Sequence, residues 1–380
     1  MNRISVVIAS LLKPVDDTRM FEKLGFSLAQ TNKYEINIIG FSIKKNIFHS
    51  NVRTFPVFRF NRTGFSRLLQ PLKYLGLLFK VKPKVIIVNS IDLLLVTLFY
   101  SSITRTIFIY DVQENYYRNI MHNSLLPFPV KNKIAWLVRL NEYICHPFIH
   151  HYLVAEKGYL DEMPFIRKKG ILLRNLYVDH FKSSAKKTKS NNKIRILYSG
   201  TIADVYGIFQ TIHFIDQFHR QYPEIEMTII GYCAHQTTLK KIRVLLADLP
   251  FIRLTGGDQL IPHEQIIEAI RNSDFGIINY ELNPATINCF PTRIYEYMGN
   301  RLPVLIQPYP PWSDFCLQHD AGIEVDFDSP DYDALILEMK NKKFYSHGIP
   351  DEIFWKEDEP RLLDLFDKIY QNHLFKKTSN

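Results

Sequence analysis

Short apolar runs alternate with amphipathic stretches along most of the chain, a pattern typical of strands and helices that follow one another in a parallel α/β fold. In the first half, the apolar runs predict five strands, at 4–9, 35–41, 85–89, 106–110 and 151–155. Apolar residues spaced three and four apart predict helices around 18–30, 93–102, 130–143 and 156–163. We therefore expect the first half to form one doubly wound sheet.

A polar, lysine-rich segment with no apolar period, DHFKSSAKKTKSNNK at 179–193, interrupts this alternation and predicts a linker at 179–192. After it, strands are predicted near 194–199, 226–230, 252–254, 275–278 and 303–306, with helices near 207–222, 236–246, 263–271 and 292–299. We expect two Rossmann-like domains, 1–178 and 193–358, with a terminal helix at about 359–376 packing back on the first. Two such sheets facing each other would place the carboxyl ends of their strands, where ligands bind, around a central cleft.

The apolar runs and the spacing of the cysteines indicate the cellular compartment of the protein. The longest uncharged apolar run of the first half, between Asp92 and Arg105, has twelve residues and is too short to cross a bilayer. The run 4–12 predicts a buried first strand, with a signal peptide as the alternative. The four cysteines lie far apart in sequence, as expected for buried thiols in a reducing compartment. A cytoplasmic protein is therefore expected.

Charge is unevenly distributed over the chain. Residues 1–180 contain 25 Lys and Arg against 12 Asp and Glu, a balance of +13, whereas 181–380 have a balance of −4. Residues 36–91 contain ten basic residues and no acidic one, and 65–80 form a cationic amphipathic stretch. Such a stretch favours an anionic membrane surface and a peripheral position on its inner face. The alternative, that its apolar residues pack in the core, stays open; no nucleic-acid-binding motif accompanies the charge, so no nucleic acid is expected as a partner.

The segment 288–305, NCFPTRIYEYMGNRLPVL, contains the most specific pattern in the chain. Pro291 suits the beginning of a helix, and Arg293 and Glu296 share one face of that helix. The free N–H groups at the helix start, from Thr292 onward, and the guanidinium together suit a diphosphate, and the carboxylate suits ribose hydroxyls. The alternative is a surface helix braced by an ion pair between residues three apart.

This segment resembles the donor-binding helix of family 4 retaining glycosyltransferases. Four other segments resemble parts of the same family: 17–20 (DTRM), 109–114 (IYDVQE), 196–208 around the Gly200 loop, and 251–280. The resemblance covers nearly the whole chain and implies the GT-B fold, with two doubly wound parallel-sheet domains. It makes 1–178 the acceptor-side domain and 193–358 the domain that binds the nucleotide-sugar donor.

The chain departs from the family at four positions of these motifs. Thr201 and Tyr206 stand where members usually carry an Arg and a Lys that bind the diphosphate. Asn288 replaces a Glu that contacts the donor sugar, and Gln113 replaces a His. Loss of two cations beside a leaving diphosphate would ordinarily remove several kcal/mol of transition-state stabilisation. Either the basic first domain supplies replacements, or catalysis is weak or absent.

The resemblance implies transfer of a sugar from a nucleotide-diphosphate donor to an acceptor hydroxyl, with retention, in the synthesis of cell-surface polysaccharide or glycolipid. The implied catalytic residues are Asp111, Glu114 and Arg293. The implied donor contacts are Gly200, Thr201, Tyr206, Asn288, Pro291, Thr292, Arg293 and Glu296, and the acceptor-side residues are Asp17, Arg19 and Gln113. No metal and no other cofactor is expected. No side-chain nucleophile is required either, because in a front-face departure the leaving diphosphate itself helps to deprotonate the acceptor.

Two other functions compete with this one. The first is a catalytically degenerate GT-B protein that binds a nucleotide sugar or glycan without turnover, which the substitutions at 201, 206 and 288 suggest. The second is a nucleotide-sugar epimerase on the same fold, although the carboxylate arrangement that such an enzyme needs is not evident in the sequence. The nucleotide sugar and a glycan or lipid-linked acceptor are the expected partners.

Overall fold

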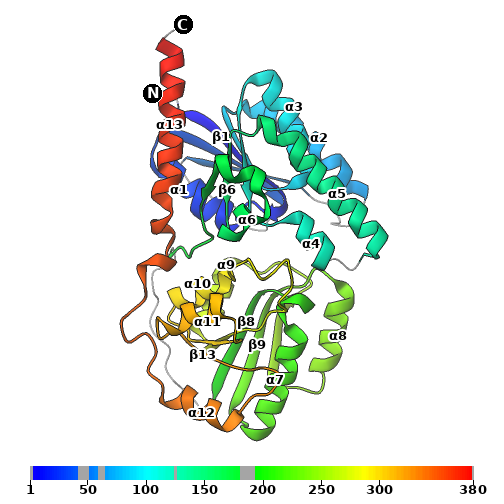
Figure 1. Cartoon of the computed structure of the whole chain (residues 1–380), viewed down its shortest axis with the longest axis vertical. Coiled ribbons are helices and arrows are strands. Elements are labelled where there is room, and N and C mark those ends of the chain that lie inside the picture. The colour runs from blue at the N-terminus through cyan, green and yellow to red at the C-terminus, as the bar shows by residue number, and fades with distance from the viewer. Residues whose placement is uncertain (1–2, 42–50, 59–64, 124–125, 180–192, 379–380) are drawn as a thin grey trace. The chain divides into compact units, whose positions relative to one another are not determined.

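The computed structural model describes residues 3–41, 51–58, 65–123, 126–179 and 193–378. The chain divides into two compact units (Figure 1): unit 1 comprises 1–178 with 355–380, and unit 2 comprises 179–354. Almost all of the predicted linker, 180–192, lies outside the described residues, as do parts of the basic region 36–91. Each unit contains one parallel sheet.

Unit 1 has a seven-stranded sheet with the order β3-β2-β1-β4-β5-β6-β7, in which every neighbouring pair is parallel. Its strands are almost wholly apolar, as expected when helices cover both faces of a sheet. Their bounds are Ile4–Pro14 (β1), Tyr34–Phe41 (β2), Val52–Phe58 (β3), Val85–Val88 (β4), Ile107–Val112 (β5), His151–Val154 (β6) and Gly170–Leu172 (β7).

The helices of unit 1 lie on both faces of this sheet, with α2, α3 and α5 together on one face and α1 and α13 on the other (Figure 1). The helix predicted at 18–30 begins as a π-helix at Thr18–Gly25 and continues as α1. The α-helices are Phe26–Gln30 (α1), Gln70–Val81 (α2), Leu94–Thr104 (α3), Tyr116–Asn123 (α4), Phe128–Cys145 (α5), Lys157–Glu162 (α6) and Glu359–Thr378 (α13). Short 3-10 helices occupy Phe65–Leu69, Ile91–Leu93, His146–Phe148 and Pro164–Lys169.

The terminal helix α13 belongs to unit 1 although its sequence follows unit 2. Its apolar face, including Leu362 and Phe366, lies in the core of unit 1 against β2 and the π-helix. The Tyr34 hydroxyl of β2 donates to the carbonyl oxygen of Phe366 at 2.6 Å. Just before the helix, the indole of Trp355 donates to the Ser27 hydroxyl at 2.9 Å. Burial of these large side chains fixes the helix on the sheet.

Unit 2 has a six-stranded parallel sheet with the order β10-β9-β8-β11-β12-β13. Its strands are Ile194–Thr201 (β8), Ile225–Tyr232 (β9), Ile252–Gly257 (β10), Phe275–Ile278 (β11), Val304–Ile306 (β12) and Gly322–Glu324 (β13). Its α-helices are Ile208–Gln221 (α7), Gln236–Leu246 (α8), His263–Arg271 (α9), Thr292–Gly299 (α10), Pro310–Leu317 (α11) and Tyr332–Asn341 (α12). Short 3-10 turns occur at Asp204–Tyr206, Asp351–Ile353 and Trp355–Glu357, the last of these in unit 1. The core combines the strand residues with α7, α8 and α12.

All ten predicted strands are present, and the structure adds three that the sequence analysis omitted, β3, β7 and β13. It also adds helices α4, α11 and α12, and it forms α2 within the cationic amphipathic stretch. None of the described helices combines the length and the apolar composition needed to span a membrane.

Candidate functional site

The strand order of unit 2 reverses at β8, which has β9 on one side and β11 on the other. In doubly wound sheets, ligands bind in the crevice at the carboxyl ends of the two strands that flank such a reversal. The loop after β8, 202–207, and the segment after β11, 279–291, therefore define a candidate site in this unit.

Gly207 holds these two loops together. It has a φ of +66°, and a Cβ at this position would lie 1.6 Å from the carbonyl oxygen of Asn279. Only glycine adopts this conformation without strain and leaves room for the second backbone. Asn279 is itself buried and donates from its amide to Gln210 of α7 at 3.0 Å. The loop after β8 is thereby fixed against the end of β11.

Arg293, the second residue of α10, places its guanidinium at the end of β8. Its Nη2 donates to the carbonyl oxygen of Thr201. Its Nε lies 3.4 Å from the position that a Cβ on Gly200 would occupy, and Gly200 has a φ of +90°. The glycine loop is therefore in van der Waals contact with the side chain expected to bind the diphosphate.

Three tyrosine rings enclose this guanidinium. The guanidinium carbon is 4.4 Å from the centre of the Tyr198 ring, 5.4 Å from that of Tyr280 and 5.7 Å from that of Tyr206. Burial raises the pKa of Tyr198 and of Tyr280, so both phenols are neutral at physiological pH. The rings offer cation–π attraction but no negative charge.

Arg293 lacks a counter-ion in the part of the chain that the structure describes. The side chain is 5% exposed, no described carboxylate pairs with it, and its buried Nη1 has no hydrogen-bond partner. A buried charge without a counter-charge is costly, and so is a buried donor without an acceptor. An anion with several oxygens would supply both. The sequence alone does not indicate this enclosure, because Tyr198 and Tyr280 have the pattern of ordinary core residues.

Glu296 lies one turn further along α10 and faces a different partner. Its Oε1 is 3.2 Å from Nε2 of His263, the first residue of α9. Among the described residues no ion pair joins Glu296 to Arg293, and most of α10 is buried, so this is not the surface helix of the alternative interpretation. His263 was not a candidate from the sequence, because its local pattern is that of any helix start.

Two aromatic side chains of the segment around α11 hold the backbone just before α10. The Tyr309 hydroxyl donates to the carbonyl oxygen of Ile287, and the Trp312 indole donates to that of Cys289, both at 2.8 Å. Asn288 lies between these two anchors and is exposed. Its backbone position is thus fixed by its neighbours, which suits a residue that contacts a ligand.

The remaining donor-side residues lie around the same strand ends. Thr201 is exposed at the end of β8, and α10 begins at Thr292, directly after Pro291. The Tyr206 ring packs against that of Tyr280, with 4.7 Å between their centres. The structure therefore brings the Gly200 loop, Tyr206 and the start of α10 together within unit 2.

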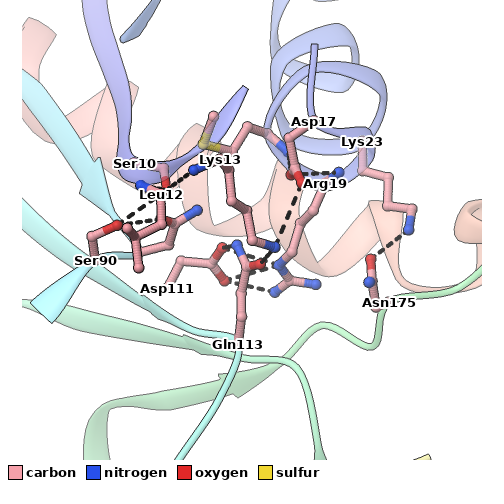
Figure 2. Close-up of polar contacts among 12 residues, drawn as sticks. Ser10, Leu12, Lys13, Asp17, Arg19, Lys23, Ser90, Asp111, Gln113 and Asn175 are labelled. Atoms are coloured by element: carbon pink, nitrogen blue, oxygen red, sulfur yellow. Dashed lines mark hydrogen bonds and ion pairs between the residues drawn. The ribbon is translucent and has the colours of Figure 1, made fainter. Parts of the chain in front are cut away.

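Unit 1 has a polar network at the carboxyl edge of its own sheet (Figure 2). Arg19 of the π-helix donates to both oxygens of Asp111 on β5, from Nε at 3.0 Å and from Nη2 at 2.7 Å. Its Nη1 donates to the carbonyl oxygen of Leu173 at 2.8 Å. Both charged side chains are 1% exposed. The pair is a buried, fully bonded connection between β5 and the helix that follows β1.

Gln113 continues this network toward solvent. Its amide donates to Oδ2 of Asp111 at 2.6 Å, and its carbonyl oxygen accepts from the ammonium of Lys13 (Figure 2). The Lys13 ammonium is also 3.5 Å from Asp17, which caps the π-helix by accepting from the backbone N–H of Arg19. An amide can donate at one end and accept at the other, which is the role of residue 113 here.

The two carboxylates expected to be catalytic, Asp111 and Glu114, lie in different environments. Asp111 is buried and accepts from two side chains, whereas Glu114 is exposed and accepts from Asn119 at 2.9 Å. Two lysines that the sequence analysis omitted lie nearby: Lys13, and Lys23, whose ammonium donates to Asn175 (Figure 2). Lys13 directly follows the apolar core of β1, the strand at which the strand order of this sheet reverses. This position in the sequence could have identified Lys13 as a candidate site residue.

No group of three or more His, Cys, Asp or Glu side chains among the described residues is arranged as a metal site. The acidic residues Asp326 and Asp328 belong to a turn rather than to a metal site. Asp326 accepts from the backbone N–H groups of Asp328 and Ser329 at 3.0 and 3.3 Å.

No protein-family model matches the sequence, and no curated protein matches it at the level of sequence. Solved structures are similar over nearly the whole chain. Sucrose-phosphate synthase from Thermosynechococcus elongatus has a TM-score of 0.69 at 12% identity, over 97% of this chain and 100% of that one. HepE from Anabaena in complex with UDP-glucose has a TM-score of 0.64 at 12% identity, over 96% and 100%. A glycosyltransferase from Rickettsia africae has a TM-score of 0.63 at 12% identity, over 98% and 100%. The chain therefore has the GT-B fold, with two Rossmann-like parallel-sheet domains.

Proposed function

We propose that this protein is a glycosyltransferase that moves a sugar from a nucleotide-diphosphate donor to an acceptor hydroxyl with retention of configuration. One observation carries the proposal: Arg293 is a buried cation without a described counter-ion, at the strand reversal of a sheet in a GT-B protein. In similar structures the ligands include UDP-glucose in HepE and ADP in a starch synthase from Arabidopsis thaliana. A nucleoside diphosphate is an anion of the kind that the site lacks.

The donor would bind through unit 2. The guanidinium of Arg293 and the backbone N–H groups at the start of α10 would bind the diphosphate, with the Gly200–Thr201 loop close to it. Glu296 would accept from ribose hydroxyls, and Asn288 would contact the sugar. As the bond to the sugar breaks, negative charge grows on the diphosphate, and the same donors would stabilise it more strongly than in the ground state.

The acceptor would bind through the residues of unit 1. Glu114 and Asp17 have carboxylates that reach solvent and can accept from an acceptor hydroxyl, whereas Asp111 would act by positioning Gln113 and Arg19. In a retaining transfer by front-face departure, the leaving diphosphate takes up the proton of the acceptor hydroxyl. Neither a side-chain nucleophile nor a metal or other cofactor is part of this proposal.

The proposed acceptor is a lipid-linked glycan or a growing cell-surface polysaccharide. The basic composition of residues 1–180 supports an acceptor near an anionic membrane. We place the protein in the cytoplasm, with a peripheral position on the inner face of the membrane.

A second candidate is a protein that binds a nucleotide sugar or glycan without turnover. The observation that favours it is the Tyr206 ring, which lies 5.7 Å from the guanidinium, at the position where the resembling family supplies a lysine. With a tyrosine in place of that lysine, the leaving group would receive less stabilisation. Binding and transfer must therefore be measured separately.

Calorimetric titration with a panel of nucleoside diphosphates and the matching nucleosides tests the donor site. Arg293→Lys keeps a charge but not the planar fork, and we expect it to weaken diphosphate binding by roughly ten-fold while leaving nucleoside binding nearly unchanged. Glu296→Gln should weaken both ligands alike. Unchanged diphosphate affinity in Arg293→Lys and in Arg293→Ala would refute the site.

Donor hydrolysis and sugar transfer, measured with the nucleotide sugars of whichever bases bind, separate the two candidates. Turnover that Arg293→Lys reduces supports the enzyme. Tight binding with no turnover in any acceptor extract supports the binding protein.

A further inference from the structure

The exposed apolar side chains of unit 1 are concentrated on one layer of helices. Among the described residues of this unit, every large apolar side chain that is exposed lies between Leu69 and Phe148. Those on α2, α3 and α5 include Leu72, Phe79, Phe99, Trp136, Leu137 and Leu140, which expose 46–64% of their surface. Exposed apolar patches of this kind mark an interaction surface.

These three helices form a continuous layer on one face of the sheet, in which α3 packs against both α2 and α5 (Figure 1). We call their outer surface the α2–α3–α5 face. On α5, Lys133, Trp136, Leu137, Leu140 and Ile144 are exposed, whereas Ala135, Glu142 and Cys145 are buried. The exposed positions recur every three or four residues, so this helix is apolar on its outer side as well as at its contact with the sheet.

The charge of these three helices indicates which kind of partner binds the α2–α3–α5 face. The three helices contain one acidic residue, Glu142, and it is buried. Exposed cations flank the apolar residues, with Lys73 beside Leu72 and Lys80 beside Phe79 on α2. A second copy of the chain on the same surface would bring cations against cations without acidic partners. Apolar helices with lysines and an interfacial tryptophan are instead typical of proteins that lie on an anionic bilayer.

We propose that the α2–α3–α5 face is the surface by which this protein binds an anionic lipid bilayer, with Trp136, Leu137 and Leu140 inserted below the headgroups. This extends the membrane part of the proposed function, which rested on the basic composition of residues 1–180, and places the principal contact on α5. Within 36–91 the structure gives a mixed result, because Phe58 and Tyr74 are buried whereas Leu72 and Phe79 are exposed.

Tryptophan fluorescence gives a local readout of this contact in the full chain. Of the three tryptophans, Trp312 and Trp355 are buried and Trp136 is 60% exposed. Vesicles of phosphatidylglycerol and phosphatidylcholine should therefore shift the emission to shorter wavelength as the Trp136 ring leaves water. Vesicles of phosphatidylcholine alone should bind much less, and added salt should weaken the binding.

Co-sedimentation of variants tests which surface makes the contact. The triple variant Trp136→Gln/Leu137→Gln/Leu140→Gln should partition on the order of a hundred-fold less onto the mixed vesicles. The matched control changes three exposed apolar residues of unit 2, Val244→Gln/Leu245→Gln/Leu337→Gln, and should bind like the parent. Lys73→Gln/Lys80→Gln leaves the apolar residues in place and should weaken binding about five-fold per lysine.

Several results would overturn the proposal: no binding to either vesicle, binding that the triple variant retains, or binding without a change in Trp136 emission. A parent chain that dimerises without lipid, paired with a monomeric triple variant, would make the face a self-association surface instead. Vesicle binding needs no nucleotide sugar, so its failure would leave the proposed transfer reaction intact. Conversely, unchanged diphosphate affinity in the Arg293 variants would refute the donor site and leave this proposal intact.

Discussion

Arg293 and Tyr198 join the start of α10 to the end of β8 by a cation–π contact, with 4.4 Å between the guanidinium carbon and the ring centre. The Tyr198 hydroxyl shares its one proton between the carbonyl oxygens of Thr201 and Tyr206, which lie 3.3 and 3.1 Å away. One side chain therefore supports the arginine with its ring and the glycine loop with its hydroxyl. These two functions can be separated by substitution.

We expect Tyr198→Phe to lower the free energy of unfolding by about 1–2 kcal/mol, because the two loop carbonyl groups lose the one donor that they share. Its ring would still support Arg293, so diphosphate affinity should fall less than three-fold. Tyr198→Leu also removes the ring and should lower that affinity by roughly ten-fold. Urea unfolding and calorimetric titration of both variants measure the two effects. Equal affinities in the two variants would show that the ring does not position Arg293.

Gly207→Ala should be among the most destabilising single changes in unit 2. The new Cβ would lie 1.6 Å from the carbonyl oxygen of Asn279, so the loop after β8 must move away from β11. We expect a loss of at least about 3 kcal/mol in the free energy of unfolding, or failure to fold. Gly348→Ala is the matched control, since Gly348 also has a positive φ, +86°, but its Cβ would meet nothing within 4 Å.

Comparison with Gly348→Ala isolates the steric contribution to the loss of unfolding free energy. Gly348→Ala should cost only the backbone strain of about 1 kcal/mol. If the two variants unfold at the same denaturant concentration, the close approach between Gly207 and Asn279 does not exist in solution.

The buried pair Arg19–Asp111 should behave as a structural unit. Asp111→Leu leaves a guanidinium that is 1% exposed without its counter-ion, and we expect a loss of about 3–5 kcal/mol in the free energy of unfolding. The double variant Arg19→Met/Asp111→Leu removes both charges and should recover most of that loss. Denaturant titration of the two variants and the parent checks this expectation. A double variant as unstable as the single one would contradict it.

Activity of the same double variant addresses the role of Asp111. If Asp111 acts only by positioning, a folded double variant should keep nucleoside-diphosphate affinity and lose transfer in part, through displaced Gln113. Complete loss of transfer in a stable double variant would favour direct contact between this carboxylate and the substrate.

Elements with a strong sequence period could be predicted almost to the residue. The helices at 236–246, 263–271 and 292–299 have the predicted bounds, because each has a clear apolar face and a polar start. The strands β7 and β13 have three residues each, too few to show any period, and β3 contains Pro56, which argues against a strand. The apolar period predicted a helix at 18–30, but it does not distinguish the π-helix at 18–25 from an α-helix.

The candidate site could be predicted only where one segment contains it. Arg293 and Glu296 lie in a single recognisable motif, whereas the contacts that give them their character are distant in sequence. Arg293 contacts Thr201, 92 residues away, and Asp111 is likewise 92 residues from Arg19. Whether a tyrosine supports a cation or fills a core depends on the tertiary fold, which no local pattern encodes.

Glu142 should make the stability of the protein depend on pH near neutrality. This α5 carboxyl accepts from the Tyr110 hydroxyl at 3.2 Å and from Arg139 at 2.7 Å, yet it is only 2% exposed. Burial raises its pKa from 4.5 to about 7, and it outweighs the opposing effect of the Arg139 charge. The folded chain therefore holds this proton more tightly than the unfolded chain does. The contribution of Glu142 is full below about pH 4.5, falls as the pH rises toward 7 and is lost above it, by at most about 3 kcal/mol.

Glu142→Gln cannot ionise; its amide oxygen can still accept from Arg139, and its NH2 group can donate to the Tyr110 hydroxyl oxygen. We therefore expect the variant to gain stability relative to the parent as the pH rises from 5 to 8. Urea unfolding at several pH values measures this difference, in which the other titrating groups cancel.

Glu338→Gln on α12 is the control, because its carboxylate is 44% exposed in a surface pair with Lys342. Its unfolding curve should stay parallel to that of the parent across the range. If Glu142→Gln also stays parallel, the carboxyl is ionised throughout, and Arg139 rather than burial determines its charge state.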